Sequence, residues 1–335
     1  MKKNLTTAVA LSLTASLTSF ADIKINDNLS LSGYAAAAYE YQKVKSTPAT
    51  DSLFDGTKDT PSADAVKTNF NFNYKPVSGT VSLYYVPNLP KNELSVLDAF
   101  VTYDAGGGFS VTGGKFLSYL GYEAFDTVNM TQITYGMVTV GTLGSIPAYH
   151  TGVRLDYGDK AVSYGIAVVD SVFSPNGFAK GDGELTHNAG FELFVKSTAT
   201  ADLTLFGSLA YDTKGGFQAE SVTILDFWAE YKLTKEATVA AEYCFKDGGE
   251  FAKGSTWLAY LNYAFSKDWS GVFRISGENL SGKTKKIADN AVMYTFGPAV
   301  KLTDNLAVRA EVSYWDYSGK GADKTLFGLQ GVFKF

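Results

Sequence analysis

Apolar and polar side chains alternate with a period of two along most of the chain, from about residue 28 to its end. In "VKTNFNFNY" (66–74) the odd positions hold only Lys or Asn, whereas the even positions hold Val, Thr, Phe or Tyr. "LAVRAEVSYW" (306–315) repeats this alternation. Because successive side chains of a β-strand point to opposite faces, the pattern predicts strands with one apolar and one polar face. No segment carries a helical stripe longer than two turns, so the chain is predicted to be all-β.

Sixteen segments carry the alternation, and most are near the roughly nine to eleven residues that a tilted strand needs to cross a bilayer. They lie at 28–42, 65–75, 79–87, 93–104, 108–117, 149–158, 161–170, 188–197, 202–213, 221–232, 236–246, 254–266, 269–278, 289–301, 304–316 and 326–335.

The connections between these segments alternate in length. Every second one is short, as in "YGDK" and "LTKE", and the others are mostly longer and rich in Gly, Ser and Asp. Antiparallel strands with both termini on one side produce this order, and bacterial outer-membrane barrels have short periplasmic turns and longer outside loops. We therefore predict an all-β, transmembrane antiparallel β-barrel of about 16 strands, within a range of 14 to 18. A soluble β-sandwich has no reason to sort its connections this way.

Aromatic residues fall at two heights on the predicted outward face, as the two interfacial girdles of a membrane barrel require. One set lies next to the short turns or the C-terminus: Tyr74, Tyr103, Tyr157, Tyr231, Phe265 and Phe335. The other lies toward the longer loops: Tyr41, Tyr85, Tyr211, Tyr243 and Tyr314. The last strand, "KTLFGLQGVFKF", is expected to close on the first, which removes the free edge that would otherwise invite aggregation.

The N-terminus predicts export. Lys2 and Lys3 precede the apolar "AVALSLTASLTSF", and Ser19–Ala21 supplies small residues for cleavage after about Ala21. We expect residues 1–21 to be a signal peptide and 22–335 to be a single barrel domain in the bacterial outer membrane. The formal net charge of −5 and the lack of a long basic tract argue against nucleic-acid binding. A single cysteine, Cys244, excludes an intrachain disulfide.

Four short motifs resemble the OmpL-like β-barrel porin family: "DIKINDNLSLSGY" (22–34), "GKFLSYLGYE" (114–123), "HTGVR" (150–154) and the terminal "GVFKF". The resemblance spans the mature chain and implies a pore-forming barrel without catalytic residues. By likeness to sixteen-stranded porins it also implies a homotrimer. The C-terminal aromatic pattern ending at Phe335 resembles the signal that the outer-membrane assembly machinery reads.

The predicted inward face is rich in charge, which a water-filled lumen would solvate, because burying unpaired ions costs several kcal/mol each. Sixteen strands leave room for such a channel. The inward residues are expected to be Lys67, Asn69, Asn71, Asp98, Lys115, Arg154, Glu192, Lys196, Asp226, Glu230, Glu242, Arg274, Glu278, Arg309 and Glu311.

The longest connection, 119–148, is the third outside loop and the candidate constriction, by its resemblance in position to the third loop of general porins. Its only charged residues are Glu123 and Asp126. We hypothesise that these acids face a basic wall drawn from Lys115, Arg154, Arg274 and Arg309, which would favour cations and orient small polar solutes. The alternative is that both acids only keep a mobile outside loop soluble.

The predicted function is passive diffusion of small hydrophilic solutes and ions, with a preference for cations and without a cofactor or catalysis. An enzyme is disfavoured because only His150 and His187 could assist a nucleophile such as Ser145. A carboxylate-bound Ca²⁺ in "AKGDGE" (179–184) stays open. The alternative function is a non-conducting adhesin, receptor or membrane tether that works through outside loops such as 43–64.

Overall fold

The computed structural model describes residues 22–45, 50–53, 65–85, 94–173, 189–198, 200–213, 220–250, 252–319 and 321–335. The expected signal peptide, His187, the "AKGDGE" segment and most of loop 43–64 lie outside these residues.

Sixteen long strands overlap the sixteen predicted segments, which confirms the predicted fold class. Two short strands, β1 (Ile23–Lys24) and β3 (Thr50–Leu53), pair only with the ends of the first long strand. The long strands are β2 (Leu29–Val44), β4 (Val66–Tyr74), β5 (Val77–Tyr85), β6 (Leu94–Gly106), β7 (Phe109–Leu117), β8 (Tyr149–Gly158), β9 (Val162–Val169), β10 (Gly190–Thr198), β11 (Leu203–Asp212), β12 (Val222–Lys232), β13 (Ala237–Asp247), β14 (Lys253–Ala264), β15 (Trp269–Leu280), β16 (Ala291–Lys301), β17 (Leu306–Tyr317) and β18 (Lys324–Lys334).

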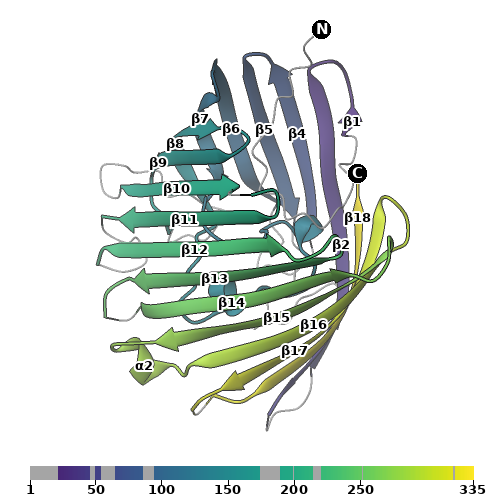
Figure 1. Cartoon of the computed structure of the whole chain (residues 1–335), viewed down its shortest axis with the longest axis vertical. Helices are drawn as coiled ribbons and strands as arrows, with labels where there is room; N and C mark the ends of the chain where they lie inside the picture. The colour runs from purple at the N-terminus through teal and green to yellow at the C-terminus, as the bar shows by residue number, and fades with distance from the viewer. Residues whose placement is uncertain are drawn as a thin grey trace.

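The strands form one closed antiparallel barrel (Figure 1). Each long strand pairs with the next along the chain, and β18 pairs with β2 from Lys324↔Val44 to Lys334↔Tyr34. Two further backbone hydrogen bonds extend this seam: Phe335 N–H to Gly33 O at 3.0 Å and Gly33 N–H to Phe335 O at 2.8 Å. Closure leaves neither terminal strand with a free edge, which resolves the problem posed by an aromatic C-terminal strand.

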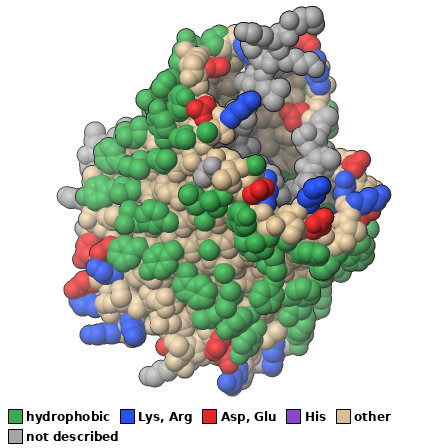
Figure 2. All heavy atoms as spheres, viewed as in Figure 1, with side chains coloured by type: hydrophobic (Ala, Val, Ile, Leu, Met, Phe, Trp, Pro, Cys, Tyr) green, Lys and Arg blue, Asp and Glu red, His purple; other side chains and the backbone are tan. Residues whose placement is uncertain are grey.

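The outer wall of the barrel is apolar. Hydrophobic side chains gather over the outward face of the strands from β9 to β16 in Figure 2. In β18 the side chains of Phe327, Leu329 and Phe333 are exposed, whereas Leu326 and Val332 are buried. This alternation is the one predicted from the sequence, and it suits a wall that faces lipid.

Both sets of predicted girdle residues lie on this outer wall. Tyr74, Tyr103, Tyr231 and Phe265 are exposed at the short-turn side, and Tyr41, Tyr211, Tyr243 and Tyr314 are exposed toward the longer loops. Tyr157 is half-buried because it packs between Phe109 and Tyr164 at ring distances of 4.8 and 4.9 Å.

Helical structure in the described part is limited to η1 (Thr127–Asn129), α1 (Met137–Val140) and α2 (Thr284–Ile287). None of the described helices is long and apolar enough to span a membrane.

Candidate functional site

The connection between β7 and β8, residues 118–148, packs against the inner face of the barrel and contains η1 and α1. We call it the inner loop. Its Tyr119, Leu120, Tyr122 and Val138 are buried in one apolar cluster with inward residues of β10 to β14. These contacts join the inner loop, which the sequence places as the third outside loop, to the inward face of the wall.

Carboxylates of the barrel wall bind the first turn of the inner loop through its backbone. Glu192 accepts hydrogen bonds from the Ser118 hydroxyl at 2.6 Å and from Tyr119 N–H at 3.2 Å. Asp226 accepts Gly121 N–H at 3.0 Å, where the glycine has φ +100°, a conformation that other residues rarely adopt. Glu242 accepts the next amide, that of Tyr122, at 2.8 Å.

Two wall carboxylates hold the later part of the inner loop in the same way. Glu311 of β17 accepts Ile133 N–H at 2.6 Å and Thr134 N–H at 3.0 Å. Glu278 of β15 accepts Leu143 N–H at 3.3 Å. Each of these hydrogen bonds satisfies a backbone N–H of the loop that has no partner in a strand, so together they anchor the loop to the wall.

These anchors correct one expectation from the sequence. Glu192, Asp226, Glu242, Glu278 and Glu311 were expected to be solvated by water in the lumen, but all five are buried. The inner loop supplies the hydrogen bonds that water was expected to supply, because its unpaired backbone N–H groups need acceptors as much as the carboxylates need donors.

Glu123 and Arg274 form a buried ion pair between the inner loop and β15. The Arg274 Nη1 is 2.5 Å from Glu123 Oε1, and the two side chains are 0% and 3% exposed. Arg274 also donates to the carbonyl oxygen of Thr134 at 2.7 Å. Glu123 accepts Gly136 N–H at 2.6 Å. The predicted partnership is therefore present, but it is enclosed by the loop and faces no open water.

Asp126, the second predicted acid, pairs with a wall residue that sequence reasoning did not select for the constriction. Lys67 Nζ of β4 lies 3.0 Å from Asp126 and 3.1 Å from Asp98 of β6. The side chain of Lys67 is 4% exposed, whereas those of Asp98 and Asp126 are 14% and 25% exposed. The two acids thus face water with the single lysine behind them. We call these three residues the acidic triad.

The remaining predicted basic residues differ in position. Arg309 of β17 is buried and donates to the inner-loop carbonyl oxygens of Thr127 at 2.7 Å and Gln132 at 3.0 Å. Arg154 of β8 is partly exposed, and its guanidinium lies 5.6 Å from the Tyr119 ring of the inner loop. Of the four bases proposed for the wall, these two and Arg274 contact the loop.

Lys115 lies on the other face of β7, which corrects the predicted wall. Its neighbour Phe116 points inward and lies under the Arg154 guanidinium, so Lys115 points outward. The Lys115 ammonium donates to the carbonyl oxygen of Val96 at 2.9 Å. Strict alternation counted from outward Phe109 would have given this side, because 109 and 115 share parity.

Aromatic side chains on the inward face of the wall pack against the inner loop, and we call this apolar surface the seat of the loop. The Tyr119 ring lies 4.5 Å from Phe194, and Phe206 stacks on Trp228 at 4.9 Å.

Burial raises the pKa of the Tyr119 phenol, and Asp156, to which the phenol donates at 2.6 Å, raises it further. The phenol therefore stays a neutral donor at all ordinary pH values.

Of the residues weighed for catalysis, Ser145 and His150 have different partners in the described part of the chain. The Ser145 hydroxyl is 3.1 Å from that of Thr256, while His150 Nε2 lies 3.5 Å from Glu192. Cys244 is buried in the seat of the loop. Within the described ranges no three His, Cys, Asp or Glu side chains form a group that could hold a metal ion.

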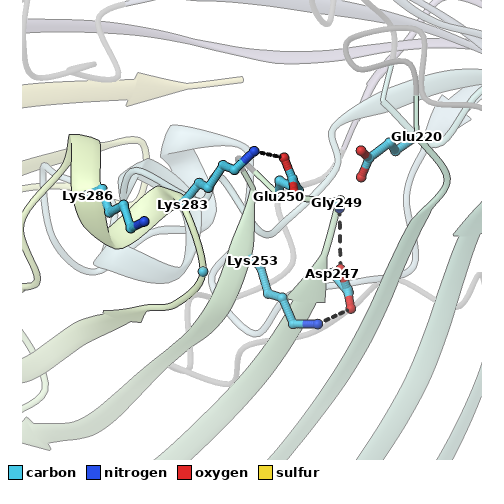
Figure 3. A pocket seen from close by; sticks show the side chains of 8 residues that line it. Glu220, Asp247, Gly249, Glu250, Lys253, Lys283 and Lys286 are labelled. Carbon is cyan, nitrogen blue, oxygen red and sulfur yellow. Dashed lines mark hydrogen bonds and ion pairs between the residues drawn. The ribbon is translucent and has the colours of Figure 1, made fainter.

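A separate pocket of about 540 Å³ lies at the long-loop ends of the strands, between the connection from β13 to β14 and the segment around α2 (Figure 3). Its charges are largely paired among themselves. Lys253 lies 2.6 Å from Asp247, and Lys283 pairs with Glu250. Exposed pairs of this kind contribute about 0–1 kcal/mol, so the pocket offers no strong recognition chemistry. Its lining comprises Glu220, Asp247, Gly249, Glu250, Lys253, Gly282, Lys283 and Lys286.

Comparison with known proteins agrees with this architecture. A family model described as "Putative beta-barrel porin-2, OmpL-like" matches residues 28–335. No curated protein sequence matches the chain.

Three solved structures share the fold at low sequence identity. OprB of Pseudomonas putida has a TM-score of 0.71 at 11% identity, covering 92% of this chain and 94% of that one. The outer membrane channel DcaP of Acinetobacter baumannii has a TM-score of 0.67 at 10% identity, covering 94% and 100%. OmpT of Vibrio cholerae, in a trimer form, has a TM-score of 0.61 at 13% identity, covering 92% and 100%.

Proposed function

Because the chain belongs to the OmpL-like β-barrel porin family, we propose that it forms a passive outer-membrane channel for small hydrophilic solutes and ions. The observation that carries this proposal is the set of charged side chains that stay partly exposed inside the closed barrel. Asp98, Asp126, Arg154 and Asp156 remain 14% to 25% exposed beside the inner loop. Charges that keep contact with water within a membrane-spanning wall favour a wet passage along β6 and β8.

The inner loop would act as the constriction, and the acidic triad would give it a preference for cations. The triad carries two carboxylates for one ammonium, and its carboxylates are the more exposed groups. An acidic rim at a narrow point attracts cations and repels anions. Glu123 has a different part in this proposal, because its charge is matched by Arg274 and it holds the loop rather than facing the passage.

Single-channel recording tests both levels of the proposal. Purified protein in a planar bilayer should give stable conductance steps, and a KCl gradient should give a reversal potential on the cation side. Asp126→Asn should lower the potassium-to-chloride permeability ratio by up to about fivefold, because a unit charge 4 Å from an ion in water is worth about 1 kcal/mol.

The matched control is Asp202→Asn, which removes the same charge at an exposed turn between β10 and β11. It should leave the ratio unchanged. A ratio unaffected by Asp126→Asn would keep the channel and remove Asp126 from its selectivity. A folded barrel without conductance would contradict the channel itself.

The second candidate function is a non-conducting adhesin, receptor or tether. One observation favours it: hydrogen bonds and ion pairs join the inner loop to strands spread around the ring, including β4, β10, β13 and β17. A loop held at so many points leaves little room for solutes. The conductance measurement separates the two functions.

We also propose how the protein reaches the membrane. Residues 1–21 would direct export and be removed after about Ala21, so that N-terminal sequencing of the mature protein starts near Asp22. The assembly machinery would engage β18 and its terminal Phe335. One structural neighbour is described as a trimer form, which supports a homotrimer here.

A further inference from the structure

Arg154 differs from the other two arginines of the chain in how its guanidinium is used. Arg274 and Arg309 are buried and donate to the inner loop. Arg154 is 23% exposed, and its Nε lies 3.2 Å from Asp156 Oδ2. Among the residues that the structure describes, no hydrogen bond or other ion pair reaches its two terminal nitrogens. These nitrogens therefore keep their donors for water or a solute.

Three rings position this guanidinium. Its carbon lies 4.8 Å from the centroid of the Phe116 ring, 5.6 Å from that of Tyr119 and 5.9 Å from that of Phe100. We call these rings the aromatic shelf. Contact with aromatic rings holds the planar cation in place at little cost, because a guanidinium is weakly hydrated.

Asp156 fixes the same cation from one side. It forms an ion pair with the guanidinium through Nε, and it accepts a hydrogen bond from the Tyr119 hydroxyl at 2.6 Å. With the carboxylate on the Nε side and the rings of the aromatic shelf against the guanidinium, the two terminal nitrogens stay available together. This fork matches the two oxygens of a carboxylate or phosphate in a bidentate contact.

Resting on the proposed channel, we propose that Arg154 on the aromatic shelf binds the oxyanion group of a passing solute, a carboxylate or a phosphate. The passage would then carry an acidic triad and a separate anion site on the same wall. Small solutes that carry an oxyanion would pause at Arg154, and their occupancy would reduce the ion current.

The test uses full-length mature protein in a planar bilayer with added succinate, inorganic phosphate or the neutral isostere succinamide. Succinate or phosphate should reduce the potassium current saturably, and succinamide should not. Arg154→Gln should weaken the block about tenfold, the loss expected for a charge-assisted hydrogen-bonded contact. Arg154→Lys should weaken it less, because an ammonium keeps the charge but loses the fork.

Lys196→Gln is the matched control. Lys196 is an inward cation on β10 that pairs with Ser163 of β9, whereas Arg154 pairs with Ala167. The four-residue separation along β9 amounts to roughly 13 Å, so the control removes equal charge away from the shelf. Succinate and phosphate should block the potassium current of Lys196→Gln as strongly as that of the unsubstituted protein. The succinate and phosphate arms tell which oxyanion the site takes.

Isothermal titration calorimetry of the detergent-solubilised barrel with the same three compounds measures binding independently of any ion current. Arg154-dependent heat in a barrel that conducts no ions would keep the site and contradict the channel. Conduction with no block and no heat, or with block that survives Arg154→Gln in protein of unchanged circular dichroism, would overturn the anion site and leave the channel standing.

Discussion

At the scale of single residues, one buried ion pair joins the inner loop to the barrel wall. Glu123 and Arg274 lie almost entirely out of water, and each is surrounded by hydrogen-bond partners of the inner loop or β16. A buried pair of this kind adds little net stability, but removing one member strands the other charge.

Replacing Arg274 with Met should therefore destabilise the protein by about 3–5 kcal/mol, the usual cost of an unpaired buried charge. The measurement is urea unfolding of the barrel in lipid vesicles, together with limited proteolysis within residues 119–148. Arg274→Met combined with Glu123→Gln should recover part of the loss, because the stranded charge is gone.

Lys24→Met is the surface control for this substitution. It breaks the exposed pair with Asp27 and should cost about 1 kcal/mol or less. If Arg274→Met proved no more costly than this control, the ion pair would not hold the loop.

The loop acids and Arg274, the partner of Glu123, were predicted from the sequence, whereas Lys67 was predicted only to face inward and not to pair with Asp126. The reason is geometric. Lys67 and Asp126 are separated by 59 positions and meet only because the inner loop crosses to β4. Nothing local to "VKTNF" distinguishes this lysine from a solvated one. Lys115 was misplaced for the opposite reason, since local parity contained the answer and the charge of the side chain was read instead.

At the scale of elements, the strands were predictable because alternation is a local property. A strand with one face toward lipid must be apolar at every second residue, wherever its neighbours lie. The path of the inner loop was not predictable to the same depth. Its anchors are carboxylates on five strands of the wall, and an alternating sequence marks these only as inward residues.

The C-terminal strand gives a prediction at this scale. Deleting Phe335 removes two backbone hydrogen bonds to Gly33 at the closing seam, and the aromatic ring next to them. At about 1 kcal/mol for each bond, the folded barrel should lose about 2 kcal/mol. The amount of folded protein in the outer-membrane fraction should fall.

Phe335→Tyr keeps both the backbone and the ring and should assemble normally. Equal amounts of folded protein from the deletion and from Phe335→Tyr would show that the terminal residue has no part in closure or in recognition by the assembly machinery.

At the scale of the whole molecule, closure joins every long strand to two neighbours, so the backbone has no weak edge. We expect the purified protein to keep its barrel in cold sodium dodecyl sulfate and to unfold only on heating. Unheated samples should migrate differently from heated ones, and a homotrimer would place the unheated band near three times the mass of the mature chain, whose uncleaved form is 36.1 kDa. Identical migration with and without heating would contradict a closed, stable barrel.

The wall carboxylates that hold the inner loop bind mostly its amide groups, which every residue except proline provides. The attachment of the loop therefore depends little on which side chains the loop carries. Residues of the loop that face the passage are open to exchange without loosening its attachment. Substitutions in the inner loop can therefore change which solutes pass, while the barrel and the attachment of the loop stay the same.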